Sequence, residues 1–324
     1  MVRRGRGAVN EVRLRRVSAS CGTRSACVSI GSGERGALGS DRMVREVEGK
    51  KETADGLPRV AASSYLNTAP LIWSFSRGPR RGEVDLITDT APARCADMLA
   101  RGQVDAALVP VIEYQRLPET VVVPGVCVGA RREVHSVVLA TRRGRLEDVE
   151  SVALDTSSRT SAALVEVIFR EFLGRAPRLE QSAPNLEEML AAHDAALIIG
   201  DPAMTFARER LRVYDMAALW REHTGLGFVF AMWMAREGAG GRVAEIDFAA
   251  ARDEGLAHAE EIAAECESEL GRPRAELVSY LRENICFELD EEMTAGLELF
   301  FRLAHKHGVT DSLRPLKWLG TRGA

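Results

Sequence analysis

The sequence predicts an α/β protein of two lobes, each built on parallel strands with crossover helices. Two observations support this fold class. Short apolar segments typical of buried strands alternate with segments of helical periodicity over residues 59–110 and again over 151–202. Two long extended segments, 133–141 and 227–235, are each able to run from one lobe into the other. Two such crossings imply a hinge between the lobes.

The first alternation contains three expected strands separated by two expected helices. In chain order they are a strand at 59–64, a helix from 70, a strand at 83–88, a helix at 91–102 and a strand at 104–110. Gly and Pro close these units, as is usual for connections between strands and helices.

The second alternation repeats this arrangement after the extended segment 133–141. Its elements are a strand at 151–155, a helix at 160–174, a short segment at 177–182, a helix at 185–193, a strand at 195–201 and a helix that begins at Pro202.

From about Asp247 the chain is helical, because apolar residues recur at helical spacing. We expect these helices to pack on the first lobe. The predicted first lobe therefore comprises 58–140 plus 230–324, and the second lobe comprises 141–229.

Residues 1–57 differ in composition from the rest. The segment is rich in Arg, Gly and Ser, and it lacks an apolar stretch long enough for a secretory signal or a membrane span. We predict a disordered basic leader. It is either a basic arm or targeting peptide, or a dispensable leader upstream of a start at Met43, and we favour the second interpretation.

The composition disfavours several classes of partner. A net charge of -4 and a charged fraction of 28% give no indication of nucleic acid or a membrane surface as a partner. No Gly-rich nucleotide-binding motif, GxSxG elbow or metal-ligand spacing is present, so we expect no cofactor and no metal. The cysteines form no CxxC pair, which predicts reduced thiols and a cytoplasmic location. They stand at positions 21, 27, 95, 127, 266 and 286.

Polar residues gather at three places where an expected strand ends and a helix begins. In open α/β sheets ligands bind at this edge, and helix N-termini attract anions. We therefore predict that the protein binds an anionic small molecule there. The candidates are Tyr65, Asn67 and Thr68 in "SSYLNTAP", Ser158, Thr160 and Ser161 in "LDTSSRTSAAL", and Asp201 in "IIGDPAM".

Each candidate also has a structural interpretation. Hydroxyl and carboxylate side chains before helices are common N-caps, and Asp201 followed by Pro202 has this pattern. Asn67 is equally compatible with a turn. Ser136 lies in an otherwise apolar extended segment, where its buried hydroxyl needs a partner from the backbone or a substrate.

A series of segments resembles the chorismate dehydratases of the futalosine route to menaquinone. In order they are "VAASSYLNTAPL", "VDAALVPVIEY", "VHSVVL", "LDTSSRTSAAL", "AALIIGDPAM", "TGLGFVFAMW" and "LDEEMTAGLELFFRLAHKHG", spanning about 58–310. The resemblance implies the two-lobed type-2 periplasmic-binding-protein fold. It also implies a hydro-lyase that converts chorismate to 3-[(1-carboxyvinyl)oxy]benzoate and water.

The resemblance implies specific roles for the candidate residues. The substrate's own enolpyruvyl carboxylate would take the ring proton, Asn67 would orient the substrate, and Ser136 would bond a carboxylate or the departing hydroxyl. The hydroxyls of the second lobe would anchor a carboxylate. Gly227 stands where the family usually has proline, which should loosen the hinge.

Two alternatives remain at this point. One is the sister enzyme 1,4-dihydroxy-6-naphthoate synthase, which is expected to rely on a histidine. The other is a non-catalytic organic-anion-binding protein. The sequence leaves formation of a homo-oligomer open.

Overall fold

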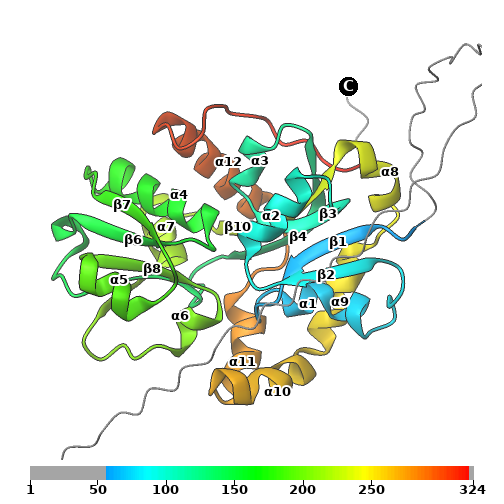
Figure 1. Cartoon of the computed structure of the whole chain (residues 1–324), viewed down its shortest axis with the longest axis horizontal. Coiled ribbons are helices and arrows are strands. Elements are labelled where there is room, and N and C mark those ends of the chain that lie inside the picture. The colour runs from blue at the N-terminus through cyan, green and yellow to red at the C-terminus, as the bar shows by residue number, and fades with distance from the viewer. Residues whose placement is uncertain (1–55, 321–324) are drawn as a thin grey trace, which may run out of the picture. The chain divides into compact units, whose positions relative to one another are not determined.

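Two mixed five-stranded sheets with helices against them make up the described part of the chain (Figure 1). The computed structural model describes residues 56–320, which belong to one compact unit, Thr53–Ala324. The α/β class with two sheets is therefore confirmed. The expected basic leader at 1–57 lies outside the described residues except for its last two positions.

The first sheet has the order β2-β1-β3-β10-β4. Strands β1, β2 and β3 are parallel, whereas β10 runs antiparallel to both β3 and β4. Apart from the exposed Arg59, the strands β1 and β3 consist of small and apolar residues, as expected for parallel strands that are buried on both faces. Their bounds are β1 (Arg59–Ser63), β2 (Asp85–Asp89), β3 (Ala106–Pro110), β4 (Thr120–Ala130) and β10 (Phe228–Arg236).

The second sheet has the order β7-β6-β8-β5-β9. Strand β6 is parallel to β7 and β8, and β5 is antiparallel to β8 and β9. The two strands that follow the crossings, β5 and β10, are thus the antiparallel members of their sheets. The bounds of the strands in the second sheet are β5 (Val137–Thr141), β6 (Ser151–Asp155), β7 (Arg178–Ser182), β8 (Ala195–Ile199) and β9 (Arg212–Asp215).

The chain passes between the sheets in two short connections. The connection 131–136 joins β4 to β5, and 225–227 leads into β10. By sheet membership, residues 137–140 lie in the second sheet and 228–229 in the first. We therefore propose to place the lobe boundaries within these connections.

Strand β4 lies outside the expected elements. Pro124 and Gly125 interrupt its apolar pattern, and the pairing of β4 with β10 shifts register along its length. Strand β9 and helix α7 (Met216–Thr224) were also not expected.

Helices connect the strands of each sheet. With the first sheet lie α1 (Ala69–Ser76), α2 (Pro92–Ala100) and α3 (Glu113–Arg116). With the second lie α4 (Arg159–Val167), its continuation as a π-helical turn (Ile168–Phe172), α5 (Leu186–Ala192), α6 (Asp201–Thr205) and α7.

The C-terminal region is helical, as expected. It contains α8 (Gly240–Val243), α9 (Phe248–Ala257), α10 (Ala259–Leu270), α11 (Arg274–Ser279) with a π-helical turn (Tyr280–Asn284), and α12 (Glu291–Lys306). Helix α9 packs on α1 and β4, in agreement with the expected packing on the first lobe. Helix α12 contacts both β10 and α4, so it also touches the second lobe.

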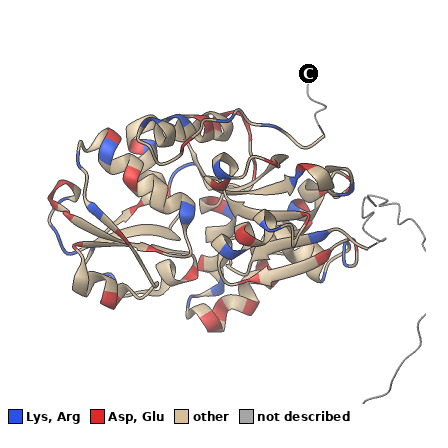
Figure 2. Ribbon diagram, turned by 45° about the horizontal axis from the view of Figure 1, so that its top comes forward, with Lys and Arg blue, Asp and Glu red and all other residues tan. Residues whose placement is uncertain are grey.

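Charged residues of both signs are interspersed along the ribbon of both sheets and their helices (Figure 2). Within residues 56–320, no helix combines the length and apolar character that a membrane span requires.

Candidate active site

A small cavity lies at the carboxyl ends of β1, β3, β6 and β8, between the two sheets. Its volume is about 50 Å³. First-lobe residues that line it include Ser63, Tyr65, Asn67, Thr68 and Pro92, and second-lobe residues include Ser157, Ser158, Thr160, Ser161, Ile199 and Gly200. This is the sheet edge at which ligands bind in open α/β folds. The lining residues include no His, Lys or Arg.

Three helix N-termini meet at this cavity. Thr68 and Ser158 are the N-caps of α1 and α4, and Pro92 is the first residue of α2. Each N-terminus carries a positive partial charge of about 0.5, and that of α4 also presents unpaired N–H groups. In α1 the N–H groups of Ala69 and Leu71 already bond to backbone carbonyl oxygens, and Pro70 has no N–H. The N-cap Ser158 makes no side-chain hydrogen bond to its helix. The arrangement is suited to hold an anion without a cationic side chain.

Asn67 is fixed by polar neighbours on both sides. The hydroxyl of Thr68 lies 3.4 Å from Asn67 Oδ1 and 2.8 Å from Ser63 Oγ. The Asn67 side chain also hydrogen-bonds to the hydroxyl of Tyr280, in the π-helical turn after α11. The amide is therefore held in one orientation at the cavity wall.

Tyr280 links Asn67 to Ser136. Its hydroxyl donates to Ser136 Oγ at 2.8 Å, and both residues are buried. Burial is the main reason why the pKa of Tyr280 lies above its ordinary value, while its hydrogen bonds to Ser136 and Asn67 act in the opposite direction. Tyr280 is therefore neutral at physiological pH, and the chain Asn67–Tyr280–Ser136 joins the first lobe to the crossing 131–136.

Asp155 organises the second-lobe side of the cavity. At the end of β6 its Oδ1 accepts hydrogen bonds from the N–H and the hydroxyl of Ser157, at 2.8 and 2.5 Å. Ser157 in turn hydrogen-bonds to Tyr65. Burial raises the pKa of Asp155 and that of Tyr65. These contacts set the orientation of Tyr65 across the gap between lobes.

Asp201 joins the lobes in a way that the sequence did not indicate. Its Oδ1 accepts a hydrogen bond from the backbone N–H of Leu66 at 3.1 Å. The N-cap of α6 is Gly200 rather than Asp201, so the N-cap interpretation of Asp201 is wrong. Burial raises the pKa of Asp201 to about 6, and the hydrogen bond from Leu66 offsets part of that effect.

Further contacts hold the two lobes together beside the cavity. The Arg159 guanidinium of α4 binds Glu113 at 3.0 Å and Asp97 at 2.7 Å, both in the first lobe. Thr160 Oγ1 accepts from the N–H of Ile112 at 3.3 Å. A cavity of about 50 Å³ is far smaller than the roughly 300–1,000 Å³ of ligand pockets. The structure is thus a closed form.

The structure brings most of the predicted site residues together. Those that line the cavity are Tyr65, Asn67, Thr68, Ser158, Thr160 and Ser161. Ser136 and Asp201 do not line it; Ser136 lies behind Tyr280, and Asp201 faces the backbone of Leu66. Two contributors were missed, Asp155 and Tyr280. An acid at a strand end two residues before Ser157 is a recognisable local signal, whereas no local pattern marks Tyr280.

Within the described range, no group of three or more His, Cys, Asp or Glu side chains is arranged to hold a metal ion. His135 does not line the cavity: it pairs with Glu133 at 3.0 Å and adopts a left-handed backbone with φ of 60°.

Comparisons with known proteins agree with this fold. A relative from Thermus thermophilus, named chorismate dehydratase, is 31% identical over 264 residues, which cover 76% of this chain and 92% of the relative. The periplasmic aliphatic sulphonate binding protein of Escherichia coli is 14% identical with a TM-score of 0.56, covering 83% of this chain and 95% of its own.

A Candida albicans protein with the generic periplasmic binding protein structural fold is 11% identical with a TM-score of 0.55, covering 83% and 99%. These two structures confirm the periplasmic-binding-protein fold that the sequence predicted. The family model described as menaquinone biosynthesis matches residues 58–306. This chain therefore belongs to the menaquinone biosynthesis family.

Proposed function

We propose that the protein is a chorismate dehydratase, a carbon–oxygen lyase that converts chorismate to 3-[(1-carboxyvinyl)oxy]benzoate and water. The observation that carries this proposal is the 31% identity to a chorismate dehydratase over most of both chains. The cavity supports it independently, because hydroxyls and helix N-termini from both lobes face a space suited to an anion.

The substrate carries two carboxylates and a ring hydroxyl. Loss of that hydroxyl and a neighbouring ring hydrogen as water makes the ring aromatic. Ser158 and Ser161, at the N-terminus of α4, have hydroxyls that donate no hydrogen bond within residues 56–320 and are available to one carboxylate. The N-termini of α1 and α2 add positive partial charge on the opposite side.

The substrate enters only when the lobes separate. The connections 131–136 and 225–227 are the natural hinge, and Arg159, Asp201 and Thr160 make the contacts that closure re-forms. Closure excludes water and fixes the substrate pose, which in favourable cases supplies roughly 7–11 kcal/mol.

Asn67 is the group we place against the reacting ring atoms, since its amide lies on the cavity wall and is held by Thr68 and Tyr280. The substrate's enolpyruvyl carboxylate acts as the base. Ser136 acts through Tyr280 in the closed form, so we assign it to positioning Asn67 rather than to a direct substrate contact. Tyr65 and Thr68 line the cavity beside the substrate.

A cytoplasmic location is part of the proposal. The four cysteines within the described range, Cys95, Cys127, Cys266 and Cys286, are free thiols, as expected in a reducing compartment.

The decisive experiment mixes the purified protein with chorismate and follows the absorbance of the new aromatic ring. Asn67→Ala should abolish turnover while the circular dichroism spectrum is retained. Asn185→Ala is the matched control, because Asn185 caps the distant helix α5. Saturable binding of chorismate without any product would support a binding protein instead. Equal rates for Asn67→Ala and Asn185→Ala would overturn the assignment of Asn67.

A further inference from the structure

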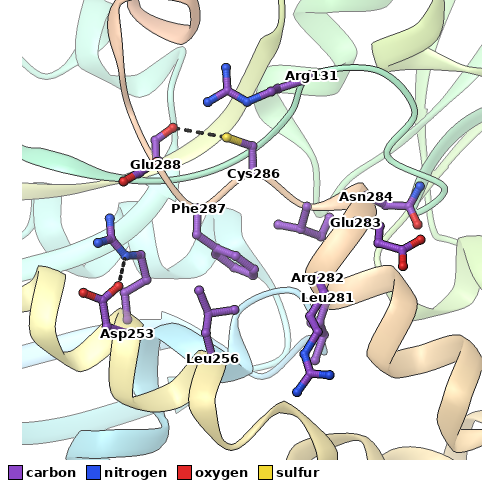
Figure 3. A pocket seen from close by; sticks show the side chains of 12 residues that line it. Arg131, Asp253, Leu256, Leu281, Arg282, Glu283, Asn284, Cys286, Phe287 and Glu288 are labelled. Atoms are coloured by element: carbon purple, nitrogen blue, oxygen red, sulfur yellow. Dashed lines mark hydrogen bonds and ion pairs between the residues drawn. The ribbon is translucent and has the colours of Figure 1, made fainter.

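A second cavity of about 570 Å³ lies away from the candidate active site. One wall is the segment Ile285–Glu288, which follows the π-helical turn Tyr280–Asn284, and another is α9 with Asp253 and Leu256 (Figure 3). The thiol of Cys286 lines this cavity and is half-buried. A small solute therefore has access to its sulfur.

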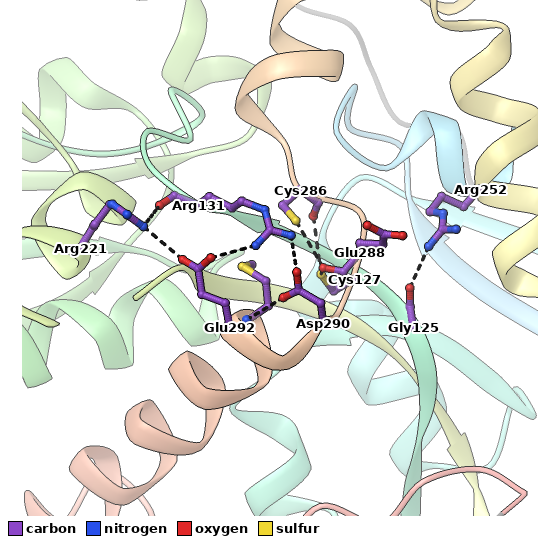
Figure 4. Close-up of polar contacts among 10 residues, drawn as sticks. Gly125, Cys127, Arg131, Arg221, Arg252, Cys286, Glu288, Asp290 and Glu292 are labelled. Atoms are coloured by element: carbon purple, nitrogen blue, oxygen red, sulfur yellow. Dashed lines mark hydrogen bonds and ion pairs between the residues drawn. The ribbon is translucent and has the colours of Figure 1, made fainter. Parts of the chain in front are cut away.

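A second thiol lies beneath Cys286. The segment pairs with β4 at Gly129 and Cys286, and this places Cys127 of β4 beside it. Both sulfurs lie near one carbonyl oxygen, that of Glu288, with Cys286 Sγ at 3.3 Å and Cys127 Sγ at 3.4 Å (Figure 4). Cys127 Sγ is also 3.5 Å from the carbonyl oxygen of Cys286. The two thiols are therefore neighbours on different segments, one accessible and one buried.

The surroundings favour the thiolate of Cys286. Its pKa falls to about 7, chiefly because the Cys127 thiol hydrogen-bonds to it, with help from the backbone of Glu288 and the charge of Arg131; burial and Asp290 act in the opposite direction. Arg131 is itself paired with Asp290 at 2.6 Å and with Glu292 at 3.1 Å. The other charged groups around the cavity are Arg252, Asp253, Arg282, Glu283 and Glu288.

The remaining described cysteines have no such environment. Cys95 is buried, and burial raises its pKa to about 12. Cys266 is half-buried like Cys286, but burial and the nearby carboxylates of Asp201 and Glu269 raise its pKa. Reactivity follows thiolate content and exposure, so Cys286 is distinguished from both.

We propose that Cys286 and Cys127 form a reversible modification site for hydroperoxides, in which Cys286 is the reacting thiolate and Cys127 resolves it to a disulfide. Cys286 attacks one peroxide oxygen: an S–O bond forms, the O–O bond breaks, and the leaving oxygen takes a proton to give water or an alcohol. The peroxide accepts the two electrons, and Cys286 becomes a sulfenic acid.

Cys127 completes the reaction. Its sulfur attacks the sulfenic sulfur, the S–S bond forms, and the hydroxyl leaves as water with the Cys127 proton. The hydrogen bond to Cys286 is the main reason why the pKa of Cys127 lies above its ordinary value. Because a sulfenic acid is neutral, its formation removes the negative charge that opposes ionisation of Cys127.

The test treats the full-length chain with hydrogen peroxide and maps its peptides without reduction. We expect a cross-linked peptide containing Cys127 and Cys286 that disappears on treatment with dithiothreitol. The oxidation rate should rise with pH through about 7. In Cys127→Ser, dimedone should label Cys286 as a trapped sulfenic acid, and Cys286→Ser should abolish both products. Cys266→Ser is the matched control and should leave the cross-link unchanged.

Two results would overturn the proposal: a peroxide-treated chain without the Cys127–Cys286 peptide, or faster oxidation of Cys266 than of Cys286. The assay does not depend on chorismate turnover, so it stands apart from the proposed function. Cys286→Ser should retain the dehydratase rate of the unmodified protein.

Discussion

The hydroxyl of Tyr280 offers a sharp test of how the candidate site is held together. Tyr280→Phe removes one oxygen atom and keeps the ring. It leaves the Asn67 amide without its hydrogen bond to Tyr280 and the Ser136 hydroxyl without its donor at 2.8 Å.

The magnitude follows from those two bonds. A buried polar group left without a partner costs about 1–3 kcal/mol. Ser136 is such a group, whereas Asn67 is half-buried and keeps its hydrogen bond from Thr68, so the expected loss of unfolding free energy is roughly 1–3 kcal/mol. The effect on catalysis arises from Asn67, because an amide displaced by ~1 Å costs up to about 100-fold in rate. We expect kcat to fall roughly 10- to 100-fold, with a smaller change in KM.

Steady-state kinetics on chorismate and urea unfolding measure the two effects separately. Tyr214→Phe is the matched control, since Tyr214 lies in β9 and does not line the cavity; both its stability and its kcat should stay near the original values. If Tyr280→Phe loses stability but keeps kcat, Tyr280 is only a structural residue. If it loses neither, the proposed chain Asn67–Tyr280–Ser136 has no energetic importance.

Three further changes test the contacts between the lobes. Burial raises the pKa of Asp201 from 3.8 to about 6, so its stabilising contribution is complete below pH 3.8 and is lost as the pH rises through about 6. Asp201→Asn should remove this pH dependence, so that the unfolding free energy measured in urea changes by up to about 3 kcal/mol less over that window. Identical pH profiles for the original protein and the variant would refute this. Gly200→Ala should destabilise by roughly 1–3 kcal/mol in thermal unfolding, because φ is 66° and ψ is -151° and a Cβ would lie 2.8 Å from the Tyr65 ring. Arg159→Gln should raise KM about tenfold without changing the secondary structure, because the closed form loses roughly 1.4 kcal/mol of stabilising free energy. An unchanged KM would show that this contact does not favour the closed form.

The part of the site that the sequence predicted is the part built from local patterns. Tyr65, Asn67 and Thr68 follow β1, and Ser158, Thr160 and Ser161 follow β6, each directly before a helix. The end of a strand and the start of the next helix depend on adjacent residues, so both are recognisable in the sequence. Parallel pairing then brings these ends to one edge of each sheet.

The part of the site that the sequence did not predict depends on contacts between distant segments. Asp201 follows the pattern of an N-cap, but closure of the lobes places it against Leu66, 135 residues away. Ser136 and Tyr280 are 144 residues apart. No local sequence pattern indicates such a pairing. Neither the position of Ser136 behind the cavity wall nor the role of Tyr280 could therefore be predicted.

Gly227 shows the same limit. In sequence it suggested a loosened hinge, but its carbonyl accepts a hydrogen bond from Trp220 at 3.1 Å. A Cβ on Gly227 itself would lie 2.4 Å from the sulfur of Met293 in α12. The glycine is thus held between two helices, and its small size serves packing as much as flexibility.

The composition of the cavity wall fits an elimination in which the substrate provides its own base. A carboxylate paired with a guanidinium or ammonium group loses about 1–3 pKa units and becomes a weaker base. The lining residues instead present hydroxyls and helix N-termini, and Arg159 is occupied by Glu113 and Asp97. Neutral donors hold an anion in place with a smaller loss of basicity, while closure removes the water that would compete for the ring proton. A wall of this kind therefore binds the dianion and still leaves one of its carboxylates able to accept a proton.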